Sequence, residues 1–191
     1  DSMISLGKKW FGGKDSDEDV DGLADMRLDS MRMGDLVDHD LKTWEVTALS
    51  VYDYDGFPTR EWQFTAGDEV RFLEREEDDG KIGWTLTRGI SIGDLPQSIT
   101  AALRADQDPP QTIGFDSRQY EAVESTSGVQ HDVDADGTAT GEGREFVSWN
   151  FETQDGRLLF LVQWSEQRIA AYEGEYVEEY SFTDILPGGQ R

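Results

Sequence analysis

The sequence reads Arg60-Glu61-Trp62-Gln63-Phe64 in its first half and Val147-Ser148-Trp149-Asn150-Phe151 in its second. Each stretch is followed by a glycine and then by a second apolar run, which are Gly67 with residues 70–74 and Gly156 with residues 158–162. An internal sequence repeat with small differences in spacing is typical of a duplicated supersecondary unit. We therefore expect two similar halves whose aromatic side chains, Trp62 and Trp149 among them, fill a core.

The stretch around Trp62 also indicates the kind of secondary structure. Trp62, Phe64 and Ala66 alternate with three polar residues, which is the period of a half-buried antiparallel strand. Turn-forming pairs such as Asp55-Gly56 separate it from similar stretches. In the second half, Glu173-Gly174-Glu175 predicts a hairpin turn between the last two strands. Each half is therefore interpreted as a meander.

These patterns predict a mainly β fold with two similar antiparallel β-meander units, which form a sandwich or paired small barrels. Asp94 and Pro96 begin a short helix that connects the units. Both units end alike, on residues 91–96 and 181–187. We divide the chain into a flexible N-terminal segment with a basic amphipathic stretch and an acidic linker (1–27), a first β unit (28–96), a helical connector (97–111) and a second β unit (112–188).

The charge of the chain limits its partners. Its 191 residues include 41 acidic and 17 basic side chains, which give a net charge of −24. Such a field repels phosphates, so we expect no nucleic-acid partner. The acidity fits a solvated surface, adaptation to a salty cytoplasm, or an acidic polyanion mimic offered to a basic partner. The sequence leaves these three alternatives open.

Composition also bears on location. The chain has no cysteine, which excludes disulfides, thiolate nucleophiles and cysteine-based zinc sites. No run reaches the roughly 18 apolar residues of a membrane helix, and the first residues lack the apolar stretch of a secretory signal. We therefore expect a cytoplasmic protein that is at most peripheral to the inner membrane.

The N-terminal segment carries a basic and aromatic patch, in which Lys8 and Lys9 stand beside Trp10 and Phe11. Apolar side chains next to lysines suit the groove of a partner protein or the surface of a membrane. We expect these four residues to contact a protein partner or the membrane.

One acidic loop resembles a metal site. Asp132, Asp134 and Asp136, followed by Gly137, match the first half of a calcium loop, in which alternate carboxylates converge on the ion. Glu142 is the candidate for the remaining carboxylate, next to the position where the loop pattern asks for it. A calcium-binding module is one hypothesis, and a solvated acidic loop is the other. The two histidines, His39 and His131, are expected in exposed turns.

The sequence shows no catalytic signature. It has no phosphate-binding glycine loop, no dinucleotide fingerprint and no nucleophile elbow. Paired carboxylates could act as acid and base only where burial separates their pKa values. Glu61, Glu74 and Glu152, which flank the aromatic strands, are the first candidates for such a pair. We expect no enzymatic activity.

The chain resembles a bacterial family, that of the domain of unknown function 4178. The residues that carry the resemblance are Trp62-Gln63-Phe64, Phe72-Leu73-Glu74, Trp84, and Tyr172-Glu173-Gly174 before Phe182. The resemblance extends from about Leu28 to Pro187 and implies no established activity. It implies an association with genes for membrane-stress and envelope-maintenance proteins, among them phage-shock-like coat proteins.

These observations together favour a non-catalytic binding or scaffold protein that acts with a bacterial envelope or membrane-stress system. Its partner is expected to be a protein, such as a membrane-associated stress protein. Two alternatives stay open, a calcium-binding module that uses the Asp132–Gly137 loop and an acidic polyanion mimic.

Overall fold

The computed structural model describes residues 26–188, and the fold over this range is mainly β, as expected. The strands are β1 (Leu36–His39), β2 (Lys42–Tyr54), β3 (Phe57–Ala66), β4 (Glu69–Asp78), β5 (Lys81–Ile90), β6 (Thr112–Phe115), β7 (Arg118–Val133), β8 (Ala139–Glu152), β9 (Arg157–Ser165), β10 (Arg168–Val177) and β11 (Thr183–Leu186). The helices are α1 (Gln97–Arg104) and the short 3-10 turns η2 (Leu28–Ser30), η3 (Ile92–Asp94) and η4 (Glu179–Ser181).

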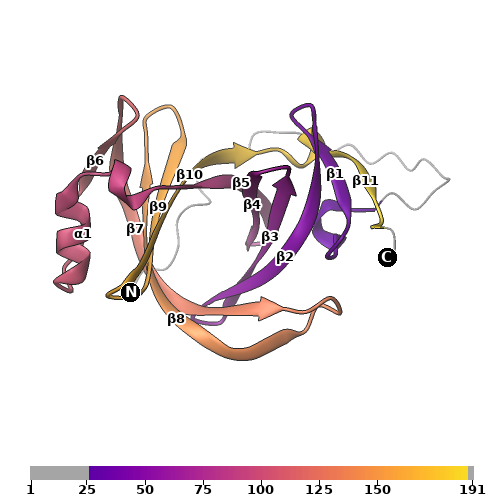
Figure 1. The fold of residues 1–191 in the computed structure, drawn as a ribbon, viewed down its shortest axis with the longest axis horizontal. Coiled ribbons are helices and arrows are strands. Elements are labelled where there is room, and N and C mark those ends of the chain that lie inside the picture. Colours follow the sequence, from indigo (N-terminus) through magenta and orange to yellow (C-terminus); the bar gives the residue numbers. More distant parts are fainter. Residues whose placement is uncertain (1–25, 189–191) are drawn as a thin grey trace.

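Two antiparallel meanders, β2 to β5 and β7 to β10, form the body of the molecule, and α1 connects them (Figure 1). The last strands of the meanders, β5 and β10, pair with each other. The first strands, β2 and β7, pair as well. The strands β2–β3–β4–β5–β10–β9–β8–β7 therefore form a closed ring, and the short strands β1 and β6 extend it outside at β2 and β7.

The register of the strands confirms the duplication. Trp62 on β3 lies opposite Leu73 on β4, and Trp149 on β8 lies opposite Leu161 on β9. The pairing of β2 with β3 is irregular between Val46 and Ala48, and the pairing of β7 with β8 is irregular at the matching place, between Ala122 and Glu124. Equivalent residues of the two halves thus occupy equivalent positions in their sheets, and both halves share the same local irregularity in strand pairing.

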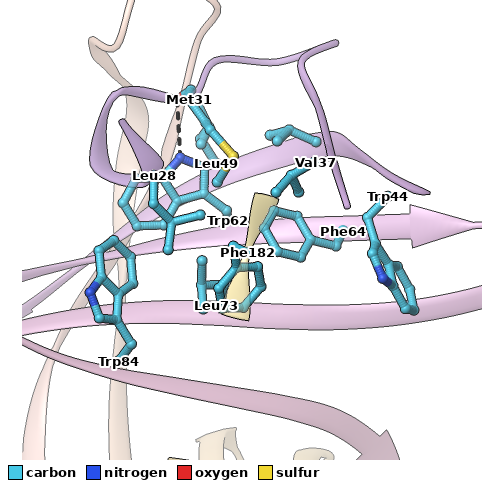
Figure 2. Close-up of a cluster of buried hydrophobic side chains, with 11 residues drawn as sticks. Leu28, Met31, Val37, Trp44, Leu49, Trp62, Phe64, Leu73, Trp84 and Phe182 are labelled. Atoms are coloured by element: carbon cyan, nitrogen blue, oxygen red, sulfur yellow. Dashed lines mark hydrogen bonds between the residues drawn. The ribbon is translucent and has the colours of Figure 1, made fainter. Parts of the chain in front are cut away.

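Each half has its own hydrophobic cluster on the strand face that carries the tryptophans. The first cluster surrounds Trp62, which is fully buried and donates its indole N–H to the carbonyl oxygen of Met31 at 3.0 Å (Figure 2). The second cluster contains Trp149, Phe151 and Leu161. Because side chains alternate along a strand, the opposite faces of the same strands point into the ring.

The segments that cover the two clusters are exchanged between the halves. After β5 of the first half, the chain passes through η3 and places Leu95, with Ile99 and Leu103 of α1, in the second cluster. After β10 of the second half, it passes through η4 and places Phe182 in the first cluster. The following strand β11 pairs with β1 of the first half (Figure 1). Leu95, which directly follows η3, therefore occupies the same place in the fold of its half as Phe182, which directly follows η4.

Two local predictions were wrong. Glu173-Gly174-Glu175 is not a hairpin turn but lies within β10, where Gly174 pairs with Thr87 of β5. A Cβ atom at Gly174 would overlap the carbonyl oxygen of Leu86, so glycine allows the two backbones to approach there. The histidines are not in exposed turns either, because both His39 and His131 are half-buried in strands.

None of the helices in the described range 26–188 is long and apolar enough to cross a membrane.

Candidate functional site: the cavity inside the ring

The ring of strands encloses a cavity of about 660 Å³. All eight ring strands contribute side chains to its lining. The pleat of each strand explains this arrangement, because the residues between the buried aromatic ones face inward. On β3, for example, Glu61 lines the cavity while its neighbour Trp62 is buried in the first hydrophobic cluster.

One side of the cavity is acidic. Glu61 on β3 and Glu74 on β4 are direct cross-strand partners, and Glu76 lies two residues further along β4. We call Glu61, Glu74 and Glu76 the acidic wall. Like charges in directly opposed positions destabilise a sheet, so the three carboxyl groups cannot all be ionised at little cost.

A second part of the cavity lining is apolar and aromatic. Its centre is a cluster of Tyr52 on β2, Phe146 on β8 and Val162 on β9, against which Tyr54 and Tyr172 pack. We call these five residues the apolar wall. The ring of Phe146 meets those of Tyr52 and Tyr54 edge to face, with centroids 5.3 and 5.4 Å apart. Such edge contacts hold the aromatic rings in defined orientations.

Burial raises the pKa values of the acidic wall. Loss of solvent raises the pKa of Glu61 to about 7, although a hydrogen bond from Tyr52 opposes the shift. The pKa of Glu74 lies well above its ordinary value because of burial and of the neighbouring Glu76 and Glu61. Burial, with Glu124 and Asp78 nearby, also raises the pKa of Glu76. At neutral pH the wall therefore retains protons and carries less than its full charge.

A chain of hydrogen bonds supports Glu61. The Trp164 indole N–H donates to Gln130 Oε1 at 3.0 Å, and Gln130 Nε2 donates to the Tyr52 hydroxyl oxygen at 2.9 Å. Because the Tyr52 hydroxyl oxygen accepts from Gln130, the hydroxyl group is free to donate its own O–H to Glu61. Gln130 is buried, so its amide orientation is set by these two partners. The chain orients the tyrosine toward the acidic wall.

The cavity reaches the surface at one end of the ring. Its lining extends to Phe57, beside the β2–β3 turn, and to Asp79 and Gly80 at the β4–β5 turn, all of which are exposed. Glu77 and Asp78 also belong to this mouth. A ligand could therefore enter between the two hairpin tips, past acidic side chains.

The sequence identified part of this site. Glu61 and Glu74 were among the carboxylates singled out beside the aromatic strands, and the structure brings these two together in the cavity. Glu152, the third, does not belong to the cavity lining. Sequence reasoning missed Tyr52, Tyr54 and Glu76. The alternation of side chains along β2 and β4 places these residues on one face of each strand, but it does not show which face lines a cavity.

The carboxylates of the proposed calcium loop do not converge. Asp132 forms an ion pair with Arg144 at 2.6 Å. Asp134 accepts the backbone N–H groups of Asp136 and Thr138, so it stabilises the β7–β8 turn. Glu142 is exposed on β8. Within residues 26–188, no group of three or more acidic, histidine or cysteine side chains is placed to hold a metal ion. Calcium binding would require this loop to rearrange.

The N-terminal contact residues Lys8, Lys9, Trp10 and Phe11 lie outside the described residues. Their expected contact with a partner or a membrane stays a prediction.

Comparison with known proteins gives a family and one similar protein. The model of the family described as "Domain of unknown function (DUF4178)" matches residues 32–179. An uncharacterized protein of Aquifex aeolicus (strain VF5) is 27% identical over 180 residues, which cover 94% of this chain and 96% of that protein. No solved structure matches the chain significantly.

Proposed function

The chain belongs to the family of the domain of unknown function 4178, and we propose that it is a non-catalytic protein that binds one small molecule inside its ring of strands. The observation that carries this proposal is the cavity of about 660 Å³ at the centre of the ring. Small-molecule sites are typically concave, roughly 300 to 1,000 Å³ in volume, and mostly apolar with a few convergent polar groups. The apolar wall and the acidic wall supply these two components.

The duplication supports a binding role for the cavity. The hydrophobic clusters around Trp62 and Trp149 lie on the strand faces that point away from the cavity. The packing of these two clusters therefore does not require carboxylates inside the ring, where desolvation is unfavourable. Groups that are retained at such a cost are characteristic of functional sites.

The chemistry of the acidic wall favours binding over catalysis. A carboxylate pair that acts as acid and base needs one group whose pKa is raised and another that stays ionised. Here the pKa values of Glu61, Glu74 and Glu76 are all shifted upward. A binding protein for a small molecule also fits the wider proposal of a protein that works with an envelope-stress partner, since ligand and partner would use separate surfaces.

Native mass spectrometry of the full chain against a library of small metabolites tests this proposal. The variant Val162→Trp fills the cavity from the apolar wall, where Val162 is 9% exposed. The variant Val147→Trp adds the same volume on β8 at an exposed position outside the cavity. We expect one-to-one complexes with the native chain and Val147→Trp, and none with Val162→Trp. Complexes that survive in Val162→Trp would contradict binding inside the ring.

A further inference from the structure

The charges around the cavity are one-sided. Besides the acidic wall, the carboxyl groups of Glu124, Glu77, Asp78 and Asp79 belong to the lining. Arg75 is the basic side chain of this lining, and it pairs with Glu77 at 2.9 Å near the mouth. Inside the mouth, the lining therefore presents acidic, aromatic and hydroxyl groups to a ligand.

Glu61 and Glu74 lack a counter-ion within the described part of the protein. The charged neighbours that act on Glu74 are Glu76 and Glu61, and the polar neighbour that acts on Glu61 is the Tyr52 hydroxyl. None of the ion pairs formed between residues 26 and 188 includes either carboxylate. Buried carboxylates are stabilised most by a cation that enters the same low-dielectric space.

The apolar wall adds aromatic surface to the cavity that holds these carboxyl groups. Tyr52 and Tyr54 stack at a centroid separation of 6.3 Å, and Phe146 lies edge-on to both. The faces of aromatic rings attract cations and also bury apolar groups. A ligand that contacts both walls meets carboxyl groups at one end and apolar surface along its body.

We propose, building on the small-molecule role argued above, that the cavity binds an organic cation, in which an ammonium group is carried on an apolar body. The ammonium group lies against Glu61 and Glu74, and the body packs on Tyr52, Phe146 and Val162. Anionic ligands are disfavoured because the cavity would place them beside carboxylates with no free basic group among its described lining residues. A bare metal ion is disfavoured because the described side chains offer no group of three metal ligands.

The mouth fits the same class of ligand. Exposed Asp79, with Asp78 and Glu77, surrounds the entrance between the hairpin tips. An entrance lined by one sign of charge concentrates ions of the opposite sign and accelerates their association. A net charge of −24 over the whole chain acts in the same direction.

Three probes with the same eight-carbon body test the charge preference: octylammonium, 1-octanol and octanoate. Their affinities for the full chain are measured by isothermal titration calorimetry at pH 8 in low salt. We expect octylammonium to bind at least about tenfold more tightly than 1-octanol, since a charge-assisted contact is roughly twice as strong as a neutral one. Octanoate is expected to bind most weakly.

The double variant Glu61→Gln/Glu74→Gln removes the charges and keeps the size and hydrogen-bonding capacity of both side chains. We expect it to lose the preference for octylammonium over 1-octanol while still binding 1-octanol. Glu166→Gln, at an exposed position between β9 and β10, is the matched control and should keep the preference. Circular dichroism spectra of all three proteins establish that each is folded.

The outcomes separate this inference from the underlying proposal. If 1-octanol or octanoate binds as tightly as octylammonium, and Val162→Trp abolishes that binding, the cavity is a binding site but its ligand is not a cation. If none of the three probes binds, the assignment of an organic cation with an apolar body is overturned, and the metabolite library still decides whether the cavity binds any small molecule.

Discussion

Glu61 and Glu173 are two glutamates with opposite environments, although both lie on ring strands. Glu61 faces the cavity, where Tyr52 donates a hydrogen bond to it. Glu173 is 3% exposed on β10 and is held by Arg88 at 2.6 Å and Arg157 at 3.3 Å. An ionised glutamate therefore destabilises the folded state at position 61 and stabilises it at position 173. The two contributions change with pH in opposite directions.

We predict that Glu61 makes the folded protein less stable as pH rises. Its pKa is raised from an ordinary 4.5 to about 7 by burial, so the folded state binds more protons than the unfolded state between these values. The contribution of Glu61 to the free energy of unfolding is therefore most favourable below pH 4.5 and decreases as the pH rises to about 7. The loss is up to about 3 kcal/mol, because a tenfold change in proton affinity corresponds to about 1.4 kcal/mol. The groups that face Glu61 are Tyr52, Tyr54, Glu74 and Tyr172.

Urea denaturation of the native chain and of Glu61→Gln at pH 4, 6 and 8 measures this effect. The glutamine variant should match the native chain at pH 4 and be more stable at pH 8. Equal stability at pH 8 would show that Glu61 ionises in the cavity without cost.

We predict the opposite sign for Glu173. Burial alone would raise its pKa, but hydrogen bonds and charges from Arg88 and Arg157 outweigh burial and lower it. This contribution is present above the ordinary pKa and is lost as pH falls through the lowered value. Glu173→Gln should cost about 2 kcal/mol near pH 7, since breaking a buried pair is expensive but both arginines are partly exposed. Thermal denaturation should show this difference shrinking below about pH 4; a constant difference would argue against it.

Among the elements, β10 depends on a glycine. It joins the two halves by pairing with β5, and a Cβ atom at Gly174 would overlap the carbonyl oxygen of Leu86. The β2–β7 junction has a similar point, because a Cβ atom at Gly128 would overlap the carbonyl oxygen of Asp53. Both junctions of the ring thus contain a glycine at a close approach of two backbones.

We predict that Gly174→Ala destabilises the protein by about 1 to 3 kcal/mol, the usual range for an overpacked site. Gly89→Ala, on the partner strand β5, is the control, because its added Cβ atom would meet no atom within 4 Å. Chemical denaturation of both variants makes the comparison. A larger loss in Gly89→Ala than in Gly174→Ala would rule out the close approach as the reason for the glycine.

At the scale of the whole molecule, the halves are coupled in three ways. The β5–β10 and β2–β7 pairings join them at both junctions of the ring. In addition, Leu95 from the first half enters the second cluster, and Phe182 from the second half enters the first cluster. Neither core is complete without the other half, although the sequence repeats.

We therefore predict a single cooperative unfolding transition for the full chain. Leu95→Ala and Phe182→Ala, which truncate opposite clusters, should each lower the midpoint of that one transition, at a cost of roughly 2 to 5 kcal/mol for each truncated side chain. Thermal melts followed by tryptophan fluorescence and by far-ultraviolet circular dichroism check this. Two separate transitions, each shifted by only one of the variants, would show that the halves fold independently.

Local patterns in the sequence determined the strands, their meander order and the duplication. Alternation of Trp62 and Phe64 with polar neighbours, and its return at Trp149, is sufficient because a strand must bury one face. The family resemblance rested on the same aromatic positions and was confirmed. The error at Gly174 has a local cause, since a glycine between glutamates has the composition of a turn whether or not the strand continues.

Only the tertiary structure decided which strands meet at the junctions, and therefore that the two meanders close around a cavity. The pairing of β2 with β7 joins residues about eighty positions apart, such as Leu49 and Val133, and no local pattern encodes such a contact. The same closure places Glu61 and Glu74, two half-buried strand glutamates, side by side in the lining of an enclosed space. The sequence specifies which side chains share a face of each strand, whereas the long-range pairing determines whether that face meets solvent or an enclosed space.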